Sequence, residues 1–103
     1  MRTVVETRMF SAQAARVWTA EYYQDFVVYI ASNPDAGAVI PGSGGVRKIR
    51  WSKQGSGKRG GVRVIYFNNS DYETWLLALY GKSERESIPV HELKKIRDAI
   101  HDR

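Results

Sequence analysis

Apolar residues in the first third of the chain recur at the spacing of two amphipathic helices. In the first helix they stand at positions 10, 14, 17 and 18, and Ser11 is a suitable N-cap. In the second they stand at positions 23, 26, 27 and 30. This helix is expected to end at Asn33, because Pro34 disfavours the α conformation in the residue before it. The preceding stretch Val4–Phe10 is rich in β-formers and predicts a first strand.

Three later segments have the composition of β-strands: Val46–Trp51, Val62–Phe67 and Trp75–Tyr80. In the first of them, Ile49 and Trp51 alternate with Lys48 and Arg50, which indicates one apolar and one basic face. The last segment is apolar at every position, and this is typical of a central strand that is covered on both faces.

The connections complete a prediction of the fold class. Residues 34–45 and Lys53–Gly61 are expected to be loops, and Asn68–Asp71 is suited to a hairpin turn. Pro89 is expected in the first turn of a C-terminal helix with apolar positions 90, 93, 96 and 100. The order β-α-α-β-β-β-α predicts an α+β fold: a small twisted antiparallel sheet, two N-terminal helices and a C-terminal helix, in one domain spanning residues 1–103.

Bulk composition is that of an ordinary folded domain. The 103 residues are 43% hydrophobic and 26% charged, and they include no cysteine. Disulfides, thiolate nucleophiles and cysteine-type zinc sites are therefore excluded. No apolar run approaches the ~20 residues of a membrane-spanning helix, and the first residues do not resemble a signal peptide. We expect a cytoplasmic protein that does not act at a membrane.

Positive charge is concentrated in the middle of the chain. Residues 36–70 contain no aspartate or glutamate but seven of the sixteen lysines and arginines. This stretch carries +7, while residues 1–35 and 71–103 carry −1 each. An uncompensated basic block flanked by β-type sequence concentrates positive potential on one surface, and a phosphate backbone is the natural ligand of such a surface.

Familiar nucleotide and metal motifs are not present. Gly57-Lys58 resembles the end of a P-loop, but Ser52 replaces its first glycine and Arg59 replaces its magnesium-binding Ser or Thr. Gly42-Ser43-Gly44 is not a dinucleotide fingerprint, because Arg47 stands where the third glycine belongs. His91 and His101 have no cysteine or acidic cluster near them, so no metal and no cofactor are expected.

The basic residues are expected to converge on one face of the sheet. Lys48 and Arg50 point to the same side of one strand, and Arg63 comes from the next. The loop between these strands would bring Lys58 and Arg59 over the rim. Clustered cations can bind a phosphodiester and stabilise a pentacovalent transition state. A solvated basic face without a ligand fits the charge pattern equally well.

Two further features adjoin this block. Lys82 directly follows Gly81 at the end of the last predicted strand, where its side chain could reach a neighbouring site or belong to an ordinary turn. Aromatic residues are interleaved with the cations, and Trp51, Tyr66 and Tyr80 could stack on bases, although packing in the core is the more common role.

Three blocks in this order resemble the HigB branch of the RelE-type toxins, which belong to bacterial type II toxin–antitoxin pairs. Gly44–Arg50 reads Gly-Gly-Val-Arg-Lys-Ile-Arg, Gly57–Tyr66 reads Gly-Lys-Arg-Gly-Gly-Val-Arg-Val-Ile-Tyr, and Leu79–Lys82 reads Leu-Tyr-Gly-Lys. The likeness covers most of the chain, including the helical N-terminal third. It implies a twisted antiparallel sheet with two N-terminal helices.

The resemblance also implies an activity and partners. Such toxins cleave mRNA in the ribosomal A site without a metal ion, by attack of the nucleotide's own 2′-hydroxyl on the adjacent phosphate. A tightly bound helix-turn-helix antitoxin, HigA-like and encoded alongside, neutralises them. The expected partners are therefore this antitoxin, in a hetero-oligomer, together with the ribosome and mRNA.

Site residues follow from the resemblance by position. Arg63 matches the arginine that holds the scissile phosphate, and Lys82 matches a basic residue that stabilises the transition state. Lys58 and Arg59 would grip the backbone, and one of them could act in proton transfer. The remaining residues assigned to RNA binding are Arg47, Lys48, Arg50, Lys53 and Tyr66.

One departure leaves alternatives open. A tyrosine found in RelE a few residues past the final strand is missing here, where the chain has Pro89. Tyr66 or Tyr80 could substitute for it. Without such a residue the chain could instead be a non-catalytic basic RNA-binding module. A gyrase-directed toxin of the related ParE type is a third possibility, which the dense basic block disfavours.

Overall fold

A computed structural model of the chain describes residues 2–51, 61–81 and 87–101. The elements in this part of the chain are β1 (Thr3–Glu6), α1 (Arg8–Val17), α2 (Ala20–Ser32), β2 (Ala38–Val39), β3 (Arg47–Trp51), β4 (Val62–Asn68), β5 (Glu73–Gly81) and α3 (Val90–His101). This arrangement confirms the α+β class with two N-terminal helices and a C-terminal helix. The loop expected at Lys53–Gly61 lies outside the described residues except for Gly61.

The strands form one sheet in the order β1-β5-β4-β3-β2. From β2 to β5 the neighbours run antiparallel, as expected, whereas β1 runs parallel to β5 with Val5 beside Trp75. The sheet is therefore mixed. A parallel pair needs a long connection, and the chain between β1 and β5 provides one. β2 was not predicted, because Ala38–Val39 is too short to show a period-2 pattern.

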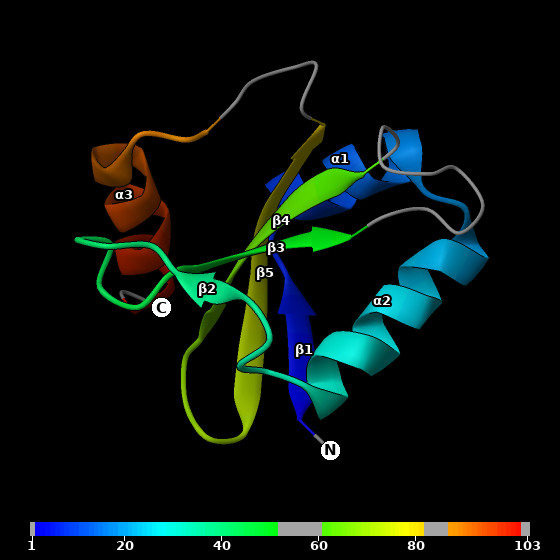
Figure 1. Ribbon diagram of the computed structural model, residues 1–103, viewed down its shortest axis with the longest axis horizontal. Helices are drawn as coiled ribbons and strands as arrows, with labels where there is room; N and C mark the ends of the chain where they lie inside the picture. Colours follow the sequence, from blue (N-terminus) through cyan, green and yellow to red (C-terminus); the bar gives the residue numbers. More distant parts are fainter. Residues whose placement is uncertain (1, 52–60, 82–86, 102–103) are drawn as a thin grey trace.

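Helices cover both faces of the sheet, with α1 and α2 on one face and α3 on the other (Figure 1). β5 lies between β1 and β4, and every residue from Thr74 to Tyr80 is buried. The uninterrupted apolar sequence of this strand thus reflects packing on both of its sides, as predicted.

A β-bulge interrupts the pairing of β4 with β5. Ile65 pairs with Ala78, but the next residue, Tyr66, pairs with Leu76, so Leu77 is an extra residue in β5. Leu77 and Ala78 consequently both pack in the cluster beneath α3. The bulge shifts the in-and-out alternation of the rest of β5 by one residue.

The start of α1 differs from the expectation. The side chain of Thr7 accepts a hydrogen bond from the N–H of Phe10 at 3.0 Å, so Thr7 is the N-cap and the helix begins at Arg8. The first strand ends at Glu6 instead of continuing to Phe10. Ser11, the expected cap, lies inside the helix, where its hydroxyl donates to the carboxylate of Glu6.

The start of α1 also covers the edge of β5 where β1 ends. Thr7 Oγ1 donates to the carbonyl of Leu77 at 2.8 Å, and the N–H of Leu79 donates to Oε1 of Gln13 at 2.8 Å. Side chains of the helical segment thus satisfy backbone groups that a longer β1 would have paired.

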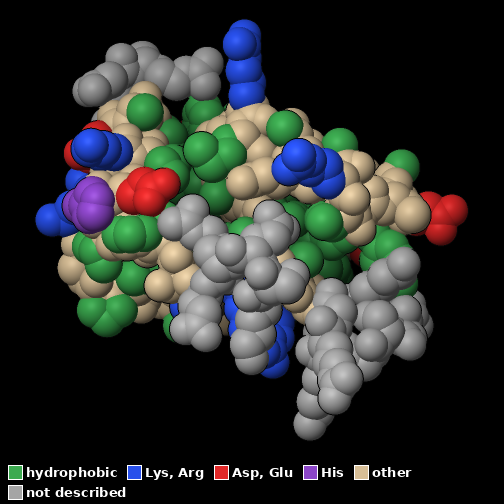
Figure 2. Space-filling model, turned by 90° about the horizontal axis from the view of Figure 1, so that it is seen from above, with side chains coloured by type: hydrophobic (Ala, Val, Ile, Leu, Met, Phe, Trp, Pro, Cys, Tyr) green, Lys and Arg blue, Asp and Glu red, His purple; other side chains and the backbone are tan. Residues whose placement is uncertain are grey.

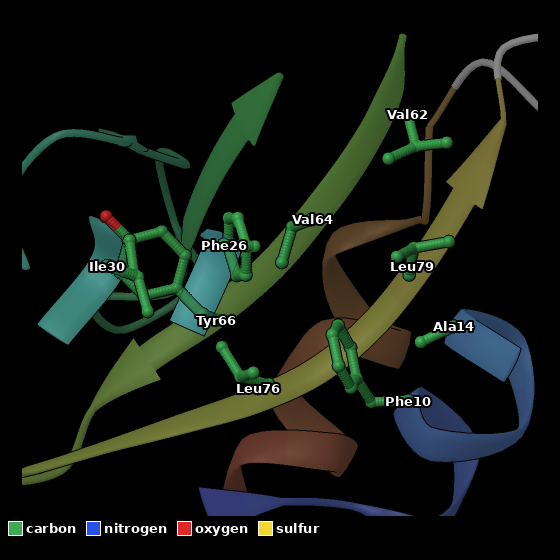
Figure 3. Packing of buried hydrophobic residues seen from close by; sticks show 9 residues of the cluster. All are labelled: Phe10, Ala14, Phe26, Ile30, Val62, Val64, Tyr66, Leu76 and Leu79. Atoms are coloured by element: carbon green, nitrogen blue, oxygen red, sulfur yellow. The ribbon is translucent and has the colours of Figure 1, made fainter. Parts of the chain in front are cut away.

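The core between the sheet and the helices α1 and α2 is continuous (Figure 3). Its nine buried residues are Phe10, Ala14, Phe26, Ile30, Val62, Val64, Tyr66, Leu76 and Leu79. They come from two helices and two strands, so burying them fixes the helices against the sheet.

On the other face, α3 is tied to the loop before β3. Arg97 lies over Gly44, whose φ of 78° suits glycine, and Nη1 of Arg97 donates to the Gly44 carbonyl at 3.3 Å. A Cβ at Gly44 would lie 1.5 Å from this nitrogen. α3 begins at Val90, directly after Pro89, whose carbonyl accepts from the N–H of Leu93 at 3.1 Å. Pro89 therefore precedes the first turn of the helix.

Candidate nucleic-acid interface

The alternation along β3 separates its cations from its apolar residues. Ile49 and Trp51 pack against the α1–α2 core, whereas Lys48 and Arg50 lie on the α3 side of the sheet and are exposed. The antiparallel register of β3 and β4 puts Arg50 directly opposite Arg63. Directly paired residues share a face, so Lys48, Arg50 and Arg63 lie together as expected, and we call these three residues the basic face.

No acid in the described part of the chain forms an ion pair with the basic face. Within residues 2–51, 61–81 and 87–101, Arg47 and Arg97 form ion pairs, whereas Lys48, Arg50 and Arg63 form none. Lys48 and Arg50 are exposed and Arg63 is partly buried, so all three have some access to solvent. Three cations without a carboxylate partner can accept an anionic ligand without first breaking an ion pair.

The rim of this face lies where three strands meet. Trp51, Val62 and Gly81 are aligned across β3, β4 and β5. Figure 2 views the molecule from this end. From here the chain continues into residues 52–60 and 82–86, which the structure does not describe. Lys53, Lys58, Arg59 and Lys82 therefore lie outside the described residues.

Arg47 does not join the basic face. It lies opposite Tyr66 on the α1–α2 side of the sheet. Its Nη1 donates to the carbonyls of Gly37 at 2.6 Å and Asp35 at 3.2 Å, and Nη2 lies 3.4 Å from the Asp35 carboxylate. These contacts hold the loop before β2 against β3, so the position of Arg47 is explained by its structural contacts.

Tyr66 is also held by contacts within the protein. Its side chain is fully buried, its hydroxyl oxygen accepts from the N–H of Gly37 at 2.8 Å, and the hydroxyl donates to the carbonyl of Pro34 at 2.8 Å. Burial raises the pKa of the Tyr66 phenol above 10.0, although the Gly37 N–H and the nearby Arg47 act in the opposite direction. The ring offers no surface on which a base could stack.

Tyr80, the other tyrosine considered as a substitute, has a different position. It is the register partner of Arg63 and packs on the α3 side of the sheet, but only 2% of it is exposed. The row Arg50–Arg63–Tyr80 across three strands follows from the register, and spacing in the sequence could not have shown it. The ring lies within the core beneath the sheet surface.

Two further observations concern metal binding and membrane insertion. Among the residues that the structure describes, His, Cys, Asp and Glu side chains form no group of three or more able to hold a metal ion. None of the helices in the described part of the chain is both long and apolar enough to cross a membrane. In the comparison with known protein families, no family model matches the chain.

Proposed function

We propose that the chain is a ribosome-dependent endoribonuclease, the toxin of a type II toxin–antitoxin pair, which holds the RNA backbone on its basic face. The observation that carries this proposal is the direct opposition of Arg50 and Arg63 on a face where no described carboxylate pairs with either. Like charges opposite one another destabilise a sheet. An anionic ligand bound between them removes that repulsion.

The chemistry of such a site needs no more than positioned cations and proton transfer. The 2′-hydroxyl of the nucleotide attacks the adjacent phosphorus, the bond to the 5′ oxygen of the next nucleotide breaks, and the negative charge on the phosphorane oxygens rises in between. Arg63 holds the scissile phosphate and stabilises that charge. By resemblance, Lys82, Lys58 and Arg59 complete the catalytic set, and Lys48, Arg50 and Lys53 extend the grip on the backbone.

The resemblance to RelE-type toxins also supplies the proposed location, target and partner of the chain. The toxin acts in the cytoplasm on ribosome-bound mRNA, and a helix-turn-helix antitoxin neutralises it in a hetero-oligomer. An adjacent short reading frame with a helix-turn-helix pattern is the cheapest supporting observation.

One specific observation favours a second candidate function, a basic module that binds RNA without cutting it. Tyr66 and Tyr80 are the tyrosines considered as replacements for the missing family tyrosine, and both are buried. Neither can reach a substrate to orient it or to move a proton. The two candidates share the basic face and differ only in cleavage.

The deciding experiment is induction of the chain in growing bacteria, followed by mapping of mRNA 5′ ends in the ribosomal fraction. New ends are expected with the native chain, and Arg63→Ala and Lys82→Ala should each lower their yield by roughly a hundredfold or more. Arg16→Ala is the matched control, because it removes one exposed arginine from α1 on the other side of the sheet.

The remaining outcomes separate the alternatives. RNA binding with unchanged 5′ ends would replace the nuclease by the non-catalytic module. A DNA-damage response without RNA cuts would point to a gyrase-directed toxin. Loss of cutting in Arg16→Ala equal to that in Arg63→Ala would remove the basic face from the proposal.

A further inference from the structure

A pocket lies at the elbow between α1 and α2, on the side of the sheet away from the basic face. It has a volume of about 360 Å³, which is within the range of small-ligand sites. Small residues open the space, with Ala15 from α1 and Ala20 from α2 on its rim. Because it lies beside the helices that cover the opposite face of the sheet, it is independent of the proposed RNA site.

Two aromatic rings form walls of this elbow pocket, and a third ring holds them. The centroid of Phe10 lies 6.2 Å from that of Trp18 and 6.4 Å from that of Tyr23. Phe10 is fully buried, whereas Trp18 and Tyr23 are partly exposed and line the pocket. These contacts restrict the orientation of both rings before any ligand binds, which lowers the entropic cost of binding.

A carboxylate completes the lining. Glu6 accepts a hydrogen bond from the hydroxyl of Ser11, which restrains its side chain at the pocket. Among the described residues that line the pocket, Glu6 is the only acid and there is no lysine, arginine or histidine. The hydroxyl of Thr19 caps the start of α2 by accepting from the N–H of Tyr22 at 3.2 Å, so one free amide at this helix end is already satisfied.

We propose that the elbow pocket binds the side chain of an arginine or lysine carried by a protein partner. A cation is attracted both by aromatic faces and by a carboxylate, whereas an anion would be repelled by Glu6. The apolar part of the lining suits the methylene stem of such a side chain. The pocket holds one such side chain, and the surface of the partner around it contributes the rest of the affinity.

The test uses the full chain labelled with ¹⁵N and titrated with the tripeptide amide Ac-Gly-Arg-Gly-NH₂. Shifts are expected at the indole N–H of Trp18 and the amides of Ala15 and Ala20. The neutral peptide Ac-Gly-Nle-Gly-NH₂ should bind about tenfold more weakly, since it lacks both the cation–π and the ionic attraction. Equal binding of the two peptides would overturn the proposal.

Two variants and one further ligand sharpen the result. Glu6→Gln should lower the affinity for the arginine peptide by about fivefold. Glu21→Gln, the same change at an exposed residue of α2, should leave this affinity unchanged. Ala15→Leu should block binding by filling the rim. An unaltered affinity in Glu6→Gln would refute the role of the carboxylate. Tighter binding of free agmatine than of the peptide would refute a partner-borne side chain.

Discussion

Arg50 lies directly opposite Arg63 across the antiparallel pair of β3 and β4. Two like charges at such a position lower the stability of a sheet, and among the described residues no carboxylate compensates for them. A merely solvated surface gains nothing from this arrangement. A surface that binds phosphate gains two cationic side chains from adjacent strands, whose backbones lie roughly 5 Å apart.

The opposition of these arginines predicts that removing one of them stabilises the protein. Arg50→Thr replaces an exposed arginine by a good β-former and should raise the free energy of unfolding by about 0.5 kcal/mol at low salt. Urea denaturation at two salt concentrations measures this, and the gain should shrink as salt screens the repulsion. Lys48→Thr is the control, because Lys48 faces Ile65 and has no cation opposite it. An equal gain in both variants would contradict the argument.

RNA binding by the basic face predicts a specific salt dependence. Each cation that neutralises a phosphate of single-stranded RNA contributes about 0.7 to the slope of log K against log salt concentration. Arg63→Ala and Arg50→Ala should therefore each reduce the slope by about 0.7, measured by fluorescence anisotropy with a labelled single-stranded RNA. Arg16→Ala should leave the slope unchanged, and a slope that is the same in all three variants would exclude phosphate contacts by these arginines.

Replacing Arg47 should have the opposite effect on stability to replacing Arg50. Arg47→Met removes the donors to the carbonyls of Asp35 and Gly37 and should destabilise the fold by about 1–3 kcal/mol, because those carbonyls lose their partner. The RNA affinity of the folded variant should stay within about twofold of that of the native chain, because Arg47 lies on the face of the sheet opposite to the basic face. Asp35→Asn should cost about 1 kcal/mol or less, because the Asp35 side chain is 81% exposed. A large loss of RNA affinity in Arg47→Met would return Arg47 to the binding site.

The sequence predicted what depends on local periodicity. The alternation of Ile49 with Lys48 and Arg50 assigned β3 its two faces, and the apolar run of β5 predicted a central strand. It could not predict that β1 pairs with β5, because parallel pairing depends on contacts between distant segments.

Contacts between distant segments also explain why the sequence predicted that Arg47 and Tyr66 bind RNA. The partners of Arg47 include the carbonyls of Asp35 and Gly37, and those of Tyr66 are the N–H of Gly37 and the carbonyl of Pro34. Every residue has a carbonyl, so no motif marks these acceptors. The sequence shows that Arg47 is basic and that Tyr66 is aromatic. It does not show that both side chains bind backbone groups of the same protein.

The buried phenol of Tyr66 predicts a component of stability that is lost at alkaline pH. Burial raises its pKa in the folded protein above the ordinary 10.0, so the folded state holds the proton more tightly than the unfolded state does. The resulting stability is complete below pH 10.0 and falls as the pH rises through the folded-state pKa. Tyr66→Phe has no such proton, and its unfolding free energy should fall less steeply over that range.

The same variant should be less stable at neutral pH. It leaves the N–H of Gly37 and the carbonyl of Pro34 without the hydroxyl, at a cost of about 1–3 kcal/mol. The two proteins should therefore converge in stability as the pH rises above 10.0, which urea denaturation across the alkaline range can follow. The difference between the two curves reports the contribution of the Tyr66 hydroxyl. Parallel curves would mean that the phenol of Tyr66 has the same pKa in the folded and unfolded states.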